Sequence, residues 1–157
     1  MIPAMRLRLI AVDKLRSAPI SALCDEFATR LQPMMPCEIR EVRAADGRAP
    51  VSAMAEEAER ILRLLPANEP LWLLERSGES LSSPQLSAKL AALDSTGISR
   101  LNLVVAGTYG AAPALLDRAT FRWSLSPLTF LHEWARALVL EQLYRAAKIA
   151  RNEPYHH

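Results

Sequence analysis

The sequence predicts an α/β domain built on a mostly parallel sheet of about five strands. Short apolar runs alternate along the chain with longer segments whose apolar residues recur at helical spacing, and proline, glycine or serine marks most of the boundaries. This alternation is typical of strands joined by helical crossovers. The 157 residues show no internal repeat, low-complexity tract or interdomain linker, so a single domain over residues 1–157 is expected.

The first half of the chain predicts two strand-and-helix units. Residues 6–12 form a compact apolar run of strand length, and Pro19 then opens a segment, ending at residue 31, whose apolar residues share one helical face. Residues 37–42 alternate with period two, as a half-buried strand does. Helical spacing returns over residues 51–65, until two prolines end it.

The second half continues the alternation. Strands are expected at residues 71–75 and 101–107, with a weaker one at 121–126, and helices at residues 83–93, around Leu115 and over 131–149. Gly78 is expected to turn the chain toward the helix that Ser82 or Ser83 caps. The last helix has an apolar face broad enough to pack on two surfaces.

Composition places limits on the class of protein. Apolar residues make up 50% of the chain and charged residues 23%, as in globular rather than disordered or fibrous proteins. The net charge of +2 gives no overall attraction to nucleic acid or membrane, so a polyanion would need a local basic patch. No run approaches the roughly 20 apolar residues of a membrane span, and no signal-peptide pattern occurs, so a cytoplasmic protein without a membrane partner is expected. Cys24 and Cys37 lack C-x-x-C spacing and are expected to be reduced thiols that bind no metal.

The turns that follow the strands are the places to look for a site. In open parallel sheets ligands bind beyond the carboxyl ends of the strands, which here means the turns after Glu75, Val105 and Ser126. The turn "AGTYG" has two glycines that let a ligand approach the backbone closely. It lacks the third glycine of a dinucleotide loop and a phosphate-binding lysine, so a tight strand-to-helix turn is the favoured explanation of this motif taken alone.

The stretch "SLSPLTFLHEWAR" predicts an extended loop that hydrogen-bonds to itself and leads into the last helix. It places His132 and Arg136 one helical turn apart on a shared face. Arginine can hold a phosphate by paired hydrogen bonds, and histidine can exchange a proton near neutral pH. The alternative is an ordinary solvated first turn.

The chain ends in a basic stripe followed by an aromatic residue and two histidines. Its members are Arg145, Lys148, Arg151, Tyr155, His156 and His157. Cations near a helix C-terminus are expected from the helix dipole, whereas a basic stripe with an aromatic residue also suits RNA backbone contact with base stacking. The final histidines could equally be a frayed end or the rest of a tag. No nucleophile elbow, H-E-x-x-H pair or Walker loop is present, which argues against a hydrolase or kinase.

Three stretches of the last third, "LVVAGTYG", "SLSPLTFLHEWAR" and "LEQLYRAAKIARNEPYHH", resemble the C-terminal half of the RlmH family. These are small methyltransferases of the SPOUT superfamily that modify N3 of a pseudouridine in large-subunit ribosomal RNA. The likeness extends upstream through "LERSGESLSSPQLSAKL" to "RLRLIAV", and so covers essentially the whole chain. It implies a C-terminal trefoil knot, a homodimer, and S-adenosyl-L-methionine as the cofactor.

The resemblance also implies which residues form the site. The cofactor would be held by Leu74, Ala106, Gly107, Leu125, Ser126, Pro127, Leu128, Thr129 and Phe130. Proton handling would fall to His132 or His156 and stacking or positioning to Tyr155, with the tail supplied across the dimer. Ribosomal RNA within the ribosome would be contacted by Arg136, Arg145, Lys148 and Arg151. No metal is implied.

Three positions depart from the family pattern. Ala106 replaces the first of two glycines, Leu131 replaces a proline, and Asp13 replaces a glycine. None of these changes removes a group assigned to the chemistry, so retained activity is expected. Two alternatives are a SPOUT-like dimer that has lost catalysis and binds RNA or ribosomes, and a methyltransferase with another RNA target, such as tRNA.

Overall fold

The computed structural model describes residues 5–155 and contains a five-stranded parallel sheet. The strands are β1 (Arg6–Val12), β2 (Cys37–Val42), β3 (Leu71–Ser80), β4 (Arg100–Val105) and β5 (Phe121–Ser124), in the spatial order β2-β1-β4-β3-β5. The helices are α1 (Ala18–Leu31), α2 (Pro50–Leu62), α3 (Ser83–Ser95), α4 (Pro113–Arg118) and α5 (His132–Ala150). The predicted α/β class with a parallel sheet is confirmed.

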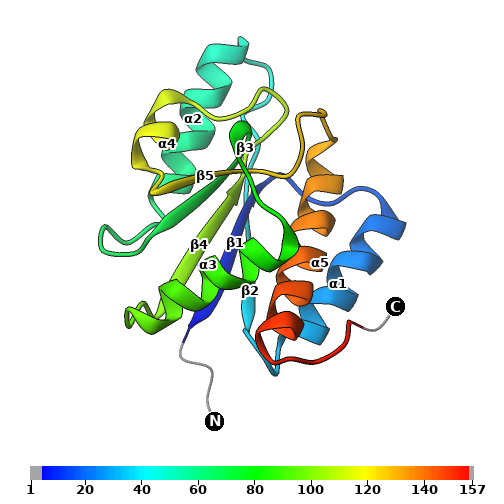
Figure 1. Cartoon of the computed structure of the whole chain (residues 1–157). Helices are drawn as coiled ribbons and strands as arrows, with labels where there is room; N and C mark the ends of the chain where they lie inside the picture. The colour runs from blue at the N-terminus through cyan, green and yellow to red at the C-terminus, as the bar shows by residue number, and fades with distance from the viewer. Residues whose placement is uncertain (1–4, 156–157) are drawn as a thin grey trace.

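The sheet lies between two layers of helices (Figure 1). α1, α3 and α5 cover one face, and α2 and α4 cover the other. Because side chains alternate along a strand, β1 sends Leu7 and Leu9 into the first layer, and Ile10 and Val12 into the second. All four are buried. A strand covered on both faces has little polar surface, which is why every residue of β1 after Arg8 is apolar. Arg8 itself is buried and pairs with Glu38 and Glu69.

Local sequence signals fix the start and end of α3. Of the two candidate caps, Ser82 is the right one: its hydroxyl accepts from the backbone N–H of Gln85 at 3.2 Å, and the Gln85 side chain accepts from the Ser82 N–H at 2.8 Å. This reciprocal pair satisfies two N–H groups that the helix itself cannot. Gly97, just beyond the helix, has φ +82°, a conformation that favours glycine.

Gly78 does not end a strand, so the turn predicted there is wrong: β3 continues to Ser80. β3 pairs with β5 on either side of a register shift between Leu74 and Glu79. A Cβ atom added to Gly78 would lie 2.6 Å from the carbonyl oxygen of Arg122 in β5. Glycine is therefore needed here because the two backbones approach closely.

Asp13 ends β1 in the left-handed region, with φ 71°. Glycine adopts this conformation at least cost, and aspartate is among the few other residues that tolerate it. The Asp13 carboxylate accepts from the backbone N–H of Lys14 at 2.9 Å and pairs with Arg16 at 2.9 Å. These local bonds stabilise the turn at a position where the resemblance leads one to expect glycine.

α5 runs along the strands, from their carboxyl ends back to their amino ends. Its 19 residues correspond to a length of about 28 Å at the usual helical rise. His132 at its start lies beside the carboxyl ends of the strands, and Ala150 at its end lies near Met5, just before β1 begins. Residues at the two ends of α5 are therefore far apart within one chain (Figure 1).

Two predictions concern the path of the whole chain: the trefoil knot and the absence of a membrane span. Strand order does not distinguish a threaded from an unthreaded chain, so the trefoil knot stays a prediction. Among the helices of residues 5–155, none is both long and apolar enough to cross a membrane.

Candidate active site

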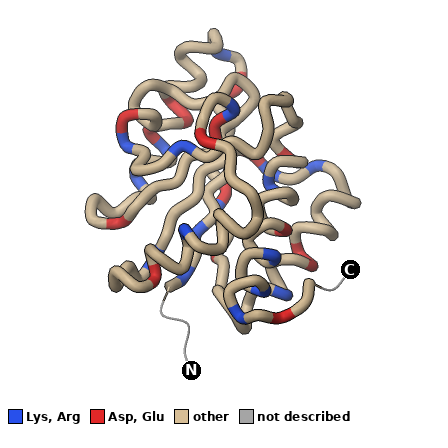
Figure 2. Tube along the Cα trace, viewed as in Figure 1, with Lys and Arg blue, Asp and Glu red and all other residues tan. Residues whose placement is uncertain are grey.

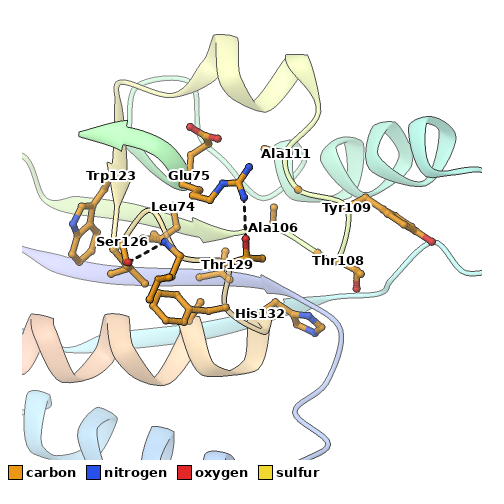
Figure 3. Close-up of a pocket in the computed structure, with 18 residues that line it drawn as sticks. Leu74, Glu75, Ala106, Thr108, Tyr109, Ala111, Trp123, Ser126, Thr129 and His132 are labelled. Carbon is orange, nitrogen blue, oxygen red and sulfur yellow. Dashed lines mark hydrogen bonds between the residues drawn. The ribbon is translucent and has the colours of Figure 1, made fainter. Parts of the chain in front are cut away.

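The carboxyl ends of β3, β4 and β5 meet around a cavity of about 450 Å³ (Figure 3). Residues that directly follow these strands, or lie in the irregular part of β3, line it; Glu75, Ala106 and Leu125 are examples. This is the edge of the sheet where parallel-strand topology places ligands. The volume lies within the range of small-molecule sites.

The cavity brings together three separate stretches of sequence. It is lined by every residue of the predicted cofactor set except Pro127: Leu74, Ala106, Gly107, Leu125, Ser126, Leu128, Thr129 and Phe130. Arg76, Thr108, Tyr109, Trp123 and Ala135 also line it and were not predicted. Thr108 and Tyr109 lie in the turn "AGTYG", which the sequence indicates as a place where a ligand can approach. For the other three residues, proximity in sequence to a predicted position is the available signal.

The turn after β4 is closed by its own backbone. The N–H of Gly110 donates to the carbonyl oxygen of Gly107 at 3.0 Å, and Gly110 has φ +90°. A turn closed in this way displays its two central residues, Thr108 and Tyr109. Gly107 and these two residues line the cavity.

The loop after β5 is tied down by hydroxyl groups, as its serine and threonine content predicts. The Ser126 hydroxyl accepts from the backbone N–H of Leu128 at 3.0 Å. Arg76, across the cavity on β3, donates from Nη1 to the Thr129 hydroxyl at 2.9 Å, and Ser124 donates to the Arg76 carbonyl oxygen at 2.8 Å (Figure 3 shows the first two of these bonds). Loop and strand are thus held together around the cavity.

A second, smaller cavity of about 190 Å³ adjoins the first. Gly107, Thr108, Tyr109 and His132 line both cavities and form the wall between them. The second cavity is polar, with the carboxylates of Asp13, Asp46 and Glu57 among its lining groups. His132 therefore stands where a group in one cavity could meet a group in the other.

Comparison with known proteins identifies the family. A family model described as "Predicted SPOUT methyltransferase" matches residues 5–156. The chain belongs to the SPOUT methyltransferase family. It is 42% identical to the ribosomal RNA large subunit methyltransferase H of Geotalea daltonii, covering 98% of this chain and 100% of that protein. It is 39% identical to the protein of the same name from Pelobacter propionicus and 38% to that from Gloeobacter violaceus, over 98% of this chain in both cases.

In this SPOUT methyltransferase Arg136 is not available to RNA, so the predicted phosphate contact is wrong. Its side chain is 1% exposed, forms an ion pair with Glu41 of β2, and donates from Nη2 to the backbone carbonyl of Asp13 at 3.0 Å. His132 and Arg136 share a helix face, as predicted, but at Arg136 that face is covered by the ends of β1 and β2. Arg136 therefore fixes the start of α5 against the sheet.

Glu133 fastens the start of α5 to the start of α1. Its Oε1 accepts from the backbone N–H groups of Arg16 at 2.8 Å and Ser17 at 3.1 Å. The hydrogen bond from Ser17, followed by that from Arg16, holds the pKa of the Glu133 carboxyl below its ordinary value of 4.5. This contact positions His132 indirectly, because the two residues are neighbours in the first turn of α5.

We expect the Glu133 contact to stabilise the protein at neutral pH and to be lost in acid. A carboxyl group whose pKa falls on folding contributes its full stabilisation above its unfolded pKa and loses it as the pH drops through the lowered folded value. The free energy of unfolding of wild type should exceed that of Glu133→Gln at pH 7, and the difference should shrink below about pH 4.5. Urea unfolding from pH 7 to pH 3 measures it, and a difference independent of pH would contradict the assignment.

The basic stripe is paired with acidic side chains of the same chain. In Figure 2 basic and acidic positions lie close together near the C-terminal end of the trace. Arg145 pairs with Glu141 at 3.2 Å, and Lys148 and Arg151 pair with Glu153 at 2.7 and 2.9 Å. Lys148 has only 13% of its side chain exposed. An RNA phosphate would therefore have to compete with these carboxylates.

Tyr155 packs against the C-terminal end of α5. Its ring lies 3.6 Å below the Arg145 guanidinium and meets the Tyr144 ring edge-on, with 5.6 Å between ring centres. Burial, together with Glu141, raises the pKa of the Tyr155 phenol, so the phenol stays protonated at neutral pH. The cavity lies at the other end of α5, so Tyr155 does not reach the cavity of its own chain. His156 and His157 lie outside the described residues.

The acidic side chains and His132 around the second cavity do not form a metal site in the described part of the chain. Within residues 5–155, no set of three or more His, Cys, Asp or Glu side chains is placed to hold a metal ion. Cys24 and Cys37 are free, and burial raises the pKa of the Cys37 thiol to about 12. At neutral pH Cys37 is therefore a protonated thiol and a poor nucleophile.

Proposed function

We propose that this chain is an S-adenosyl-L-methionine-dependent methyltransferase that methylates N3 of a pseudouridine in large-subunit (23S) ribosomal RNA. The observation that carries the proposal is the cavity at the ends of β3, β4 and β5, which gathers the residues nominated for the cofactor in a chain of the SPOUT methyltransferase family. The relatives' names, ribosomal RNA large subunit methyltransferase H, support the RNA target.

The lining of the cavity suits the cofactor. Leu74, Leu125 and Phe130 offer apolar surface to a purine ring, and the turn at Ala106 and Gly107 offers backbone groups to its polar edge. Arg76 supplies a charged group that a carboxylate of the ligand could meet. When bound, the cofactor supplies a methyl group on a positively charged sulfonium. The loop after β5 orients the ligand, because its hydroxyl bonds fix the loop before binding.

His132 is our candidate for handling the proton of the substrate. The pseudouridine N3 carries a proton that must leave before or during methyl transfer, and an imidazole has an unperturbed pKa near neutrality. His132 borders both cavities, so it can serve an acceptor base in one while the cofactor occupies the other. His156 is the second candidate, and it belongs to the tail.

A homodimer explains how the tail could act. Tyr155 lies at the far end of α5 from its own cavity, so its predicted role next to the substrate requires a second copy of the chain. Five large apolar side chains of the described residues remain exposed at or near the cavity: Tyr109, Leu128, Phe130, Leu131 and Trp134. Exposed apolar residues gathered on one region are typical of an interface. Leu131 and Trp134, at the start of α5, would lie in this interface.

Arg145, Lys148 and Arg151 are proposed to contact the RNA backbone next to the partner's cavity. Their pairing with Glu141 and Glu153 means that RNA must displace or rearrange these carboxylates, which favours a preformed ribosomal surface over free RNA. Because ribosomes are the substrate, the protein is assigned to the cytoplasm. Neither a metal nor a membrane takes part.

Two measurements test this function. Calorimetry should show saturable binding of S-adenosyl-L-methionine, with one site per chain. Ribosomes from a strain lacking the gene should gain one methyl group when they are incubated with the protein and S-adenosyl-L-methionine. Mass spectrometry should map this methyl group to N3 of a pseudouridine. Absence of cofactor binding at high concentration would overturn the enzyme assignment, and a methyl group on tRNA would overturn the target.

A second candidate function is a dimer that binds ribosomes without catalysis. Ala106 favours it, because its methyl group lies in the cavity lining where the family pattern has glycine. Ala106→Gly distinguishes the two. If the methyl group blocks the cofactor, the variant should bind S-adenosyl-L-methionine where wild type does not. If wild type already binds, the second candidate fails.

A further inference from the structure

The carboxylate of Glu57 is buried beside the second cavity. Glu57 lies on α2, is 7% exposed, and accepts from the backbone N–H of Ala45 at 3.0 Å through Oε2. No lysine, arginine or histidine within residues 5–155 pairs with it. Glutamate is rarely buried unless paired, so this position calls for an explanation.

The second carboxylate oxygen of Glu57 faces the turn after β4. A Cβ atom added to Gly107 would lie 2.8 Å from Oε1 of Glu57 and 3.2 Å from Cγ1 of Val12. The φ angle of Gly107 is not positive, unlike that of Gly110, so its backbone conformation does not require glycine. A side chain at position 107 would require the Glu57 carboxylate to move, and this movement would disturb its hydrogen bond with Ala45.

We propose that Glu57 is a positioning residue for the cofactor turn of residues 106–110. One carboxylate group contacts two segments at once: Oε2 holds Ala45 in the loop after β2, and Oε1 lies against Gly107. Gly107 is part of the wall between the two cavities. α2, on one face of the sheet, thereby fixes a turn that lines the cavity.

The role of Glu57 is one of shape and hydrogen bonding rather than charge. A side chain of the same size that still accepts from Ala45 preserves both contacts, whereas a short side chain leaves the turn without support. The effect on the cofactor rests on the function proposed above, but the contact between residues 57 and 107 belongs to the protein without ligand. The two can therefore be tested separately.

The first experiment measures the contact without cofactor. Gly107→Ala should lower the melting temperature by about 5 °C or more, because the added methyl group overlaps Oε1 of Glu57. In a Glu57→Ala background the same substitution should cost less than half as much. The loss of stability is only partly relieved, because the added methyl group still lies close to Val12. Equal costs in the two backgrounds would overturn the contact, whether or not the protein binds S-adenosyl-L-methionine.

The second experiment measures ligand binding by calorimetry at a temperature where all variants are folded. Glu57→Ala should weaken S-adenosyl-L-methionine binding about tenfold, and S-adenosyl-L-homocysteine, which lacks the positive charge, to the same extent. Glu57→Gln should bind both ligands within about threefold of wild type. Glu59→Ala, which removes an exposed carboxylate from the same helix, should leave binding unchanged.

The outcomes separate the hypotheses. If wild type binds neither ligand, the proposed cofactor fails, and the contact is judged by the melting temperatures alone. If wild type binds and Glu57→Ala loses affinity only for the charged ligand, the carboxylate acts as a counter-charge and the positioning role is overturned. Loss of affinity in Glu57→Gln equal to that in Glu57→Ala, or no loss in either, would also overturn it.

Discussion

Deleting residues 154–157 should abolish methylation of ribosomes while cofactor binding and dimerisation persist. Tyr155 packs at the end of α5 that lies away from the cavity of its own chain, so its loss does not disturb that cavity directly. The deletion should lower the free energy of unfolding by only about 1 kcal/mol, which is the usual contribution of such a contact between aromatic rings. Methyl transfer to ribosomes, calorimetry and sedimentation measure the three properties. Full activity of the truncated chain would show that the tail is dispensable.

Mixed dimers test whether the tail acts on the partner's site. A chain lacking residues 154–157 keeps its own cavity, and a chain carrying His132→Ala keeps its tail. Each homodimer should be inactive, but mixing and re-equilibrating the two should restore activity, because one site in the heterodimer then has an intact cavity and an intact tail. If mixing restores nothing although heterodimers form, the tail does not act across the dimer. Tyr155→Phe is the matched control that keeps the packing against Tyr144.

Replacing Arg136 with methionine should destabilise the protein by about 1–3 kcal/mol, because it removes a buried cation that holds both Glu41 and the Asp13 carbonyl. The Glu41 side chain is 38% exposed, so water partly replaces the lost partner. Methionine keeps most of the volume of the side chain, so the loss reflects the ion pair with Glu41 and the hydrogen bond to the Asp13 carbonyl. One term opposes the loss: Nε of Arg136 is buried without a hydrogen-bond partner, and the substitution removes that cost as well. Urea unfolding measures the net effect.

The control for Arg136 is an arginine whose ion pair is exposed. Arg63→Met removes the pair with Glu59 on α2, where both side chains are more than 60% exposed, and should cost less than about 1 kcal/mol. Adding Glu41→Gln to Arg136→Met should recover part of the loss, since it removes the unpaired carboxylate. A loss in Arg136→Met no larger than in Arg63→Met would show that the burial of Arg136 contributes nothing to stability.

Much of the fold follows from local sequence features. The strand at residues 6–12 is predicted from its apolar run and the cap at Ser82 from its hydroxyl group, because both depend on neighbours along the chain. The location of the cavity also follows, since parallel strands must bring their carboxyl ends to one edge. Serine and threonine in the loop after β5 predict bonds within the loop, and the bond from Leu128 to Ser126 is one of them.

Other features depend on which segment lies across from a residue, and sequence spacing does not contain that information. Spacing places His132 and Arg136 on one helix face but does not tell that the ends of β1 and β2 cover Arg136. Glycine is typical of a turn, yet the reason for glycine at position 78 is the close approach of the β5 backbone.

Glu57 and the tail show the same division. A glutamate on a helix is expected to face water, and only the turn after β4 and the loop at Ala45 make Glu57 a buried contact. The sequence determined the family, the order of the elements and the edge of the sheet that carries the site. The tertiary structure decided which charged groups are buried and that Tyr155 lies far from its own cavity, because these depend on contacts between segments distant in sequence.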